Sequence, residues 1–260
     1  NTSYLEMIRD AGVVGAGGAG FPTHVKLKSE PEYVIANCAE CEPLIKSDKH
    51  LMELHAQEIV QGLEIAMEVT GAGKGVLAVK EKNHAAVAAL YSAIRDKKNI
   101  SVHLLENYYP AGDEQQIIYE VTGRVVPVGQ IPIKVGCVVC NAQTLYQIKL
   151  AADGKPFIKR NVTVTGAVNH PVTMTVPIGT AIPYLIDLAG GTTTDDYVVV
   201  IGGPLMGRVS KDVSKEFVTK TTNGVIVLPR DNTLITLKTG DMDRQLKIAR
   251  AACCQCNYCT

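Results

Sequence analysis

The chain has 260 residues, 46% apolar and 20% charged, and its 26 basic residues balance its 26 acidic ones. Zero net charge, the absence of Trp and only three Phe argue against an electrostatic or stacking platform for nucleic acid. The sequence contains no apolar run of about 18 residues and no basic, apolar leader. We therefore expect a cytoplasmic protein that does not insert directly into a membrane.

Residues 1–155 alternate between helical and strand patterns. Helical spacing of apolar residues is found at 3–11, 55–71, 83–96, 114–121 and 141–153, and strand-like apolar runs at 33–38, 75–80, 100–107 and 135–140. Alternation of this kind is typical of an α/β fold whose parallel strands are buried on both faces. We predict that residues 1–155 form such a domain.

The pattern changes after Gly154. Val and Thr alternate at period two from residue 160, a helical pattern starts at Thr180, and short strands follow at 197–207 and 224–229. This order predicts a small mixed β domain with one helix, arranged as a β-grasp, over residues 156–245. The segment 246–260 begins as a helix and ends in cysteines, which predicts the start of a third domain.

The segment from residue 15 to residue 20, Gly-Ala-Gly-Gly-Ala-Gly, satisfies the G-x-G-x-x-G pattern. A dinucleotide fingerprint needs a strand before it and a helix opening from it, but here a helix precedes and Pro22 follows. The loop also lacks the Gly-Lys-Ser/Thr ending of a Walker loop. The residues alone leave two interpretations open, a phosphate-binding loop with Lys26 beside it or a long turn that needs glycine.

A longer comparison favours phosphate binding. The segments GAGGAGFPTHVK, NCAECEP, YYPAGDEQQIIYEVTGRVVP and CNAQTLYQI occur in the order found in one flavoprotein family. This family contains the NADH-oxidising flavoprotein subunit of respiratory complex I, the C subunit of Rnf complexes and the cobalamin reductases of propanediol-utilisation microcompartments. VPIGTAIPYLIDLAGG and GGPLMG are similar to its soluble-ligand-binding β-grasp domain, so the resemblance spans essentially the whole chain.

The resemblance implies a site for FMN, with NAD(H) as a substrate. The backbone of the glycine loop and Lys26 would hold the phosphate and ribityl chain, polar side chains would complete the flavin pocket, and carboxylates would lie near the flavin and the nicotinamide ribose. The residues implied are Gly15, Gly17, Gly18, Gly20, Lys26, Asn37, Glu40, Glu42, Asp113, Glu114, Asn141 and Thr144. The chain departs from the complex I pattern at Ala16, Ala39 and Cys140, so FMN is indicated more strongly than NAD(H). No side chain is indicated as a nucleophile or general base.

Eight cysteines fall in three groups. Cys253, Cys256 and Cys259 have the C-x₂-C-x₂-C spacing of ligands to a [4Fe–4S] cluster, and the fourth ligand would fall beyond Thr260. We therefore expect the sequence to end inside a ferredoxin-type domain. The pairs Cys38/Cys41 and Cys137/Cys140 allow two interpretations, a four-cysteine zinc site or small buried apolar residues.

The leading hypothesis is an electron-transfer oxidoreductase. It would pass electrons from NAD(P)H through FMN to [4Fe–4S] clusters, and on to cobalamin or an Rnf-type partner, as part of a larger complex. The resemblance also admits a place in a microcompartment or at the cytoplasmic face of a membrane complex. Two alternatives stay open: a module at about 160–245 that binds cobalamin or a protein partner without flavin chemistry, and a structural zinc protein built on the two cysteine pairs.

Overall fold

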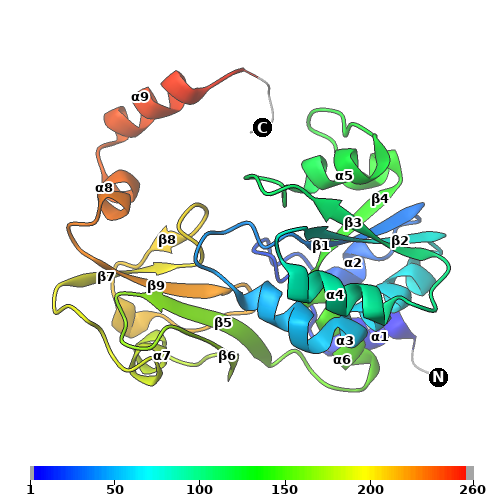
Figure 1. Cartoon of the computed structure of the whole chain (residues 1–260), viewed down its shortest axis with the longest axis horizontal. Coiled ribbons are helices and arrows are strands. Elements are labelled where there is room, and N and C mark those ends of the chain that lie inside the picture. The colour runs from blue at the N-terminus through cyan, green and yellow to red at the C-terminus, as the bar shows by residue number, and fades with distance from the viewer. Residues whose placement is uncertain (1–2, 256–260) are drawn as a thin grey trace.

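Two β-sheets lie side by side in the structure, a computed structural model that describes residues 3–255 (Figure 1). The first sheet is fully parallel, with strand order β3-β2-β1-β4. Its strands are β1 (Tyr33–Cys38), β2 (Lys74–Lys80), β3 (Ile100–Leu105) and β4 (Cys137–Asn141). The parallel pairing confirms the predicted α/β fold. We call this sheet and its helices the parallel-sheet region.

Helices cover both faces of the parallel sheet because its strands are apolar on both faces. The helices of this region are α1 (Tyr4–Asp10), α2 (Thr23–Lys26), α3 (Ser47–Thr70), α4 (His84–Ala93), α5 (Glu114–Thr122) and α6 (Ala142–Ala152), with a 3₁₀ turn at Pro132–Val135. In β1, Val34 and Cys38 pack with α3 and α6, whereas Ile35 packs with α5 on the other face. Because successive side chains of a strand point to opposite faces of the sheet, β1 contributes residues to the apolar cores on both faces.

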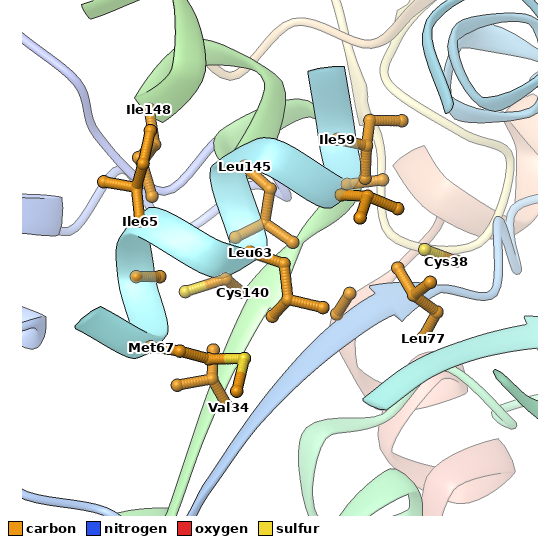
Figure 2. Close-up of a cluster of buried hydrophobic side chains, with 14 of the residues drawn as sticks. Val34, Cys38, Ile59, Leu63, Ile65, Met67, Leu77, Cys140, Leu145 and Ile148 are labelled. Atoms are coloured by element: carbon orange, nitrogen blue, oxygen red, sulfur yellow. The ribbon is translucent and has the colours of Figure 1, made fainter. Parts of the chain in front are cut away.

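The larger core lies between the sheet and helices α3 and α6. Figure 2 shows Leu63 and Met67 of α3 pointing toward Val34 of β1, with Leu145 of α6 above them. Cys38 and Cys140 lie in this apolar cluster and are almost fully buried.

Helix α3 begins earlier than the sequence pattern indicates. We predicted 55–71, but the helix starts at Ser47 and has non-helical backbone angles at His55 (φ −132°, ψ 32°). The prediction of the start was wrong because a carboxyl group outside the helix, eight residues before Asp48, supports it: Glu40 Oε2 accepts a hydrogen bond from the Asp48 N–H at 2.7 Å.

The second sheet is mixed, with strand order β6-β5-β9-β7-β8. Its strands are β5 (Lys159–Gly166), β6 (Val172–Pro177), β7 (Tyr197–Ile201), β8 (Arg208–Val209) and β9 (Gly224–Pro229), and helix α7 (Ile182–Leu188) packs on it. We call this part the mixed-sheet region. It has the mixed sheet and packed helix predicted for a β-grasp arrangement.

After the mixed sheet, α8 (Thr233–Thr239) packs on it through the buried Ile235, whereas α9 (Met242–Ala252) extends away from both sheets (Figure 1). A second 3₁₀ turn spans Val213–Lys215. Among residues 3–255, no helix combines the length and the apolar character needed to cross a membrane.

Helix α3 approaches α6 so closely that Gly62 has no room for a side chain. A Cβ on Gly62 would lie 1.9 Å from the Leu145 carbonyl oxygen, a backbone atom that cannot rotate away. In an exposed helix, Gly→Ala stabilises by about 1 kcal/mol. Here we expect Gly62→Ala to destabilise the protein by about 1–3 kcal/mol through overpacking.

Denaturant unfolding measures this change, with Gly73→Ala as the matched control. Gly73 has open space around its Cβ position. We expect the control to unfold within about 0.5 kcal/mol of the wild type. A stabilised Gly62→Ala variant would contradict the observed packing of α3 against α6.

Candidate functional site

Two adjoining hollows lie where β1 and β4 end. The register pairs Asn37 of β1 with Asn141 of β4, so both side chains stand at the same carboxyl edge. The strand order reverses at β1, and ligands of open α/β sheets bind in the crevice at such a point. The hollows have volumes of about 280 and 250 Å³, and both are lined by Gly17, Asn37 and Asn141.

The glycine loop forms a closed turn over this edge. The Gly15 N–H donates to the Phe21 carbonyl at 2.8 Å, and the Gly20 N–H donates to the Gly15 carbonyl at 3.0 Å. Gly18 and Gly20 have φ angles of 130° and 66°, a region that residues with a Cβ rarely adopt. The structure therefore gives a conformational reason for these two glycines.

Three successive backbone amides of this loop are free to bind a ligand. Within the described residues, the N–H groups of Gly17, Gly18 and Ala19 donate to no protein acceptor, and all three residues are exposed. A phosphate carries several strong acceptor oxygens, and a run of backbone N–H groups is a common anion cradle. The loop therefore has the donor set that a phosphate requires.

The polar side chains around the hollows are held by short hydrogen bonds. Asn37 Nδ2 donates to the Gly112 carbonyl at 2.8 Å, and Asn141 Oδ1 accepts from the Gln143 N–H at 3.0 Å. Thr144 Oγ1 accepts from the Ala16 N–H at 2.9 Å. These contacts fix the glycine loop to α6 and the loop before α5 to the end of β1.

Lys26 lies in the smaller hollow and is already paired. Its Nζ lies 3.0 Å from Glu114 Oε1 and 2.6 Å from the Val139 carbonyl oxygen. Asp113 lies in the larger hollow and caps α5, accepting from the N–H groups of Gln115 and Gln116 at 3.0 Å each. These charged groups therefore support the local structure as well as lining the hollows.

Glu40 and Glu42 have different environments. Glu42 joins the two sheet regions by accepting from the N–H groups of Leu205 and Met206 at 2.9 and 2.6 Å. Glu40 faces inward with a φ of 37°. Burial and the neighbouring Asp48 carboxylate raise the pKa of Glu40 to about 8.

Two buried charges at the site were not predicted. Asp48 accepts from Asn141 Nδ2 at 2.7 Å, and burial raises its pKa. Arg160 of β5 is 2% exposed, and burial lowers its pKa to about 10. A signal was present, because Arg160 shares the period-two face of Val162 and Val164, and Asp48 precedes the buried Leu51 by three residues.

The two hollows bring together most of the residues that the resemblance indicated. Those that line one or both hollows are Gly15, Gly17, Lys26, Asn37, Glu40, Glu42, Asp113, Glu114, Asn141 and Thr144. Gly18 lines a neighbouring hollow of about 350 Å³ between the loop and the mixed-sheet region, and Gly20 shapes the turn. This clustering places the residues without testing their predicted roles, which stay predictions.

The cysteines lie in different environments. Cys137 packs on the opposite face of the sheet from Cys38 and Cys140. Among residues 3–255, no group of three or more His, Cys, Asp or Glu side chains could hold a metal ion. Cys253 is exposed at the end of α9, and the other two predicted cluster ligands, Cys256 and Cys259, lie outside the described residues.

A parallel α/β sheet with a glycine loop at its switch point is the arrangement found in α/β proteins that bind phosphate-bearing ligands. Residues 8–150 match the family described as the Nuo51 FMN-binding domain, and residues 161–209 match the SLBB domain. The first match covers more than half of the chain, so the chain belongs to the Nuo51 FMN-binding domain family. The resemblance noted from the sequence is thereby confirmed.

The curated relatives include two kinds of redox protein. The chain is 46% identical over 256 residues to the cobalamin reductase PduS of Salmonella typhimurium, covering 98% of this chain and 56% of the relative. It is 40% identical over 236 residues to the C subunit of the Na⁺-translocating ferredoxin:NAD⁺ oxidoreductase complex of Acetobacterium woodii, covering 88% and 53%. The chain thus spans about half the length of these relatives.

Among solved structures, an NAD⁺-reducing [NiFe]-hydrogenase in the H₂-reduced state is similar, with a TM-score of 0.75 and 22% identity. The similarity covers 88% of this chain and 47% of the hydrogenase chain. At this identity the match establishes the shared fold.

The environment of Glu40 predicts a pH-dependent stability. A carboxyl group whose pKa is raised by folding makes its full contribution to stability at pH values below its ordinary pKa of 4.5. This contribution is lost as the pH rises through about 8, the pKa in the folded protein. We expect Glu40→Gln to reduce the fall in the free energy of unfolding between these pH values, by on the order of a few kcal/mol.

Urea unfolding at several pH values measures this effect. Glu68→Gln is the control, because Glu68 is exposed on α3. The control should follow the wild type at each pH. Parallel curves for Glu40→Gln and the wild type would show that Glu40 titrates as an ordinary surface carboxyl.

Proposed function

We propose that this chain is the FMN-binding part of an electron-transfer oxidoreductase. The observation that carries the proposal is the cradle of three free amides at the carboxyl edge of β1 and β4, in a chain of the Nuo51 FMN-binding domain family. The two hollows beside the cradle, lined by Asn37 and Asn141, offer the concave polar and apolar walls that a cofactor needs.

In this proposal the amides of Gly17, Gly18 and Ala19 bind the FMN phosphate. Asn37, Asn141 and Thr144 keep the walls of the pocket in place through the hydrogen bonds described above. Bound FMN supplies the exchange between two-electron and one-electron transfer, and the protein supplies orientation and electrostatics. The Lys26–Glu114 pair keeps the smaller hollow close to neutral.

NAD(P)H is the proposed electron donor. Carboxyl oxygens accept hydrogen bonds from the hydroxyl groups of a ribose, and Glu40 and Asp113 both line the larger hollow. Relatives named as part of an NAD⁺ oxidoreductase complex and as a cobalamin reductase support redox chemistry with these partners. In this proposal Cys253, Cys256 and Cys259 would bind a [4Fe–4S] cluster whose fourth ligand is expected beyond residue 260, and electrons would pass to cobalamin or a protein partner.

The division of the chain at about residue 155 belongs to this proposal. The FMN site would be built mainly by residues 1–155, the β-grasp domain by 156–245, and the iron–sulfur domain would start at 246–260. The family matches at 8–150 and 161–209 support the first boundary.

The proposal is tested by FMN titration of the purified protein followed by anaerobic addition of NADH. We expect saturable FMN binding, and loss of the visible flavin absorbance when NADH is added. FMN that binds without this loss would leave the cofactor in place and exclude NADH as the donor. A protein that takes up no FMN would contradict the proposal and favour a flavin-free binding module.

Filling the cradle provides a second test. A Cβ on Gly17 would lie 3.3 Å from the Asn141 Cβ, so Gly17→Val places methyl groups at the wall shared by both hollows. We expect the FMN dissociation constant to rise by at least about tenfold, which corresponds to about 1.4 kcal/mol.

Isothermal titration calorimetry measures this change, and Gly73→Val is the matched control. Gly73 has open space and lies at the opposite end of the sheet, just before β2. The control should bind FMN as the wild type does. Equal FMN affinity in both variants would place the cofactor away from the glycine loop.

A further inference from the structure

The peptide between Ala16 and Gly17 is held from the mixed-sheet region. The Ala16 carbonyl accepts a hydrogen bond from Arg160 Nη2 at 2.8 Å, while the Ala16 N–H donates to Thr144 in the parallel-sheet region. Ala16 and Arg160 are almost fully buried. One residue of the glycine loop is thus fixed from both sheet regions.

Peptide geometry transmits this contact to the neighbouring amide. In a planar trans peptide the C=O and N–H groups point in opposite directions. The Ala16 carbonyl and the Gly17 N–H belong to the same peptide unit. Since the carbonyl points to Arg160, the Gly17 N–H points away from Arg160, where it forms the first of the three free donors.

Arg160 is itself rigidly placed. Its Nε donates to the Thr222 carbonyl and its Nη1 donates to the Lys220 carbonyl, so the guanidinium joins three backbone oxygens from two parts of the chain. The planar guanidinium offers donors in a fixed fork, which a lysine ammonium cannot reproduce. The position of the glycine loop therefore depends on the guanidinium shape as well as on the charge.

We propose that Arg160 is a positioning residue for the phosphate of FMN. It orients the Gly17 N–H toward the phosphate by holding the other end of the same peptide unit. The proposal rests on the proposed function, in which the glycine loop binds the FMN phosphate. It adds that a residue of the mixed-sheet region determines the affinity of the parallel-sheet region for a phosphate ester.

The test compares FMN with riboflavin, which has the same ring and ribityl chain but no phosphate. We expect Arg160→Lys to raise the FMN dissociation constant by about tenfold and to change that of riboflavin by less than about twofold. A purely structural role would weaken both ligands equally. Fluorescence quenching measures both constants, and melting temperature reports whether the variant is folded.

Thr163→Val is the matched control for contacts between the two sheet regions. Thr163 Oγ1 accepts a hydrogen bond from the Lys46 N–H at 3.0 Å, so it also joins the regions, but its side chain is bonded neither to Arg160 nor to the Ala16–Gly17 peptide. We expect this variant to lower the melting temperature while leaving the ratio of FMN to riboflavin affinity unchanged.

A measurement on the wild type covers the case in which Arg160 variants fail to fold. In ¹H–¹⁵N spectra, the Gly17 amide should shift on addition of FMN and not on addition of riboflavin. An unchanged affinity ratio in Arg160→Lys would overturn the inference alone, whereas equal Gly17 shifts with the two ligands would overturn both the inference and the proposed amide cradle for the phosphate. A wild-type protein that binds neither flavin would overturn the proposed function instead.

Discussion

The site depends on the register of β1 against β4. Parallel pairing sets Asn37 opposite Asn141 at one edge, and the reversal of strand order at β1 leaves a crevice there that the crossing helices do not fill. Asn37 then binds the loop before α5, and Asn141 begins α6. The glycine loop lies close to this edge as well, because a Cβ on Gly17 would lie 3.3 Å from the Asn141 Cβ.

A buried polar cluster joins this edge to the mixed-sheet region. Glu40, Asp48 and Arg160 would each be costly to bury alone, and each has hydrogen-bonded partners. Glu40 supports the start of α3, and Arg160 holds the glycine loop. The same contacts that compensate for burying charge also bring the two regions together around the hollows.

The two lines of evidence for the FMN site have different origins. Family membership follows from residues 8–150, and the free amides follow from the geometry of the loop. The similarity to the hydrogenase supports only the shared fold, because 22% identity carries no information on individual side chains. The matches cover 56% and 53% of these relatives, so their complete activities belong to proteins with further parts.

The family resemblance indicated the residues around the hollows. Local patterns in the sequence were sufficient for the parallel sheet and the change of architecture after Gly154. Each of these depends on neighbours close in sequence, such as the two-residue period of β1 or the glycines of the loop. The early start of α3 was not predictable in this way. Glu40, which supports that start, lies in the loop before the helix, and the sequence pattern does not predict how this loop folds back.

The sequence by itself determined which kinds of element form and which loop could meet a phosphate. Only the tertiary structure decided that Arg160 fixes that loop, that Lys26 is paired with Glu114, and that Glu42 joins the two regions. The physical reason is that a buried charge is stabilised by partners far away in the chain. Arg160 and Ala16 are 144 residues apart, and no local periodicity encodes a contact over such a separation.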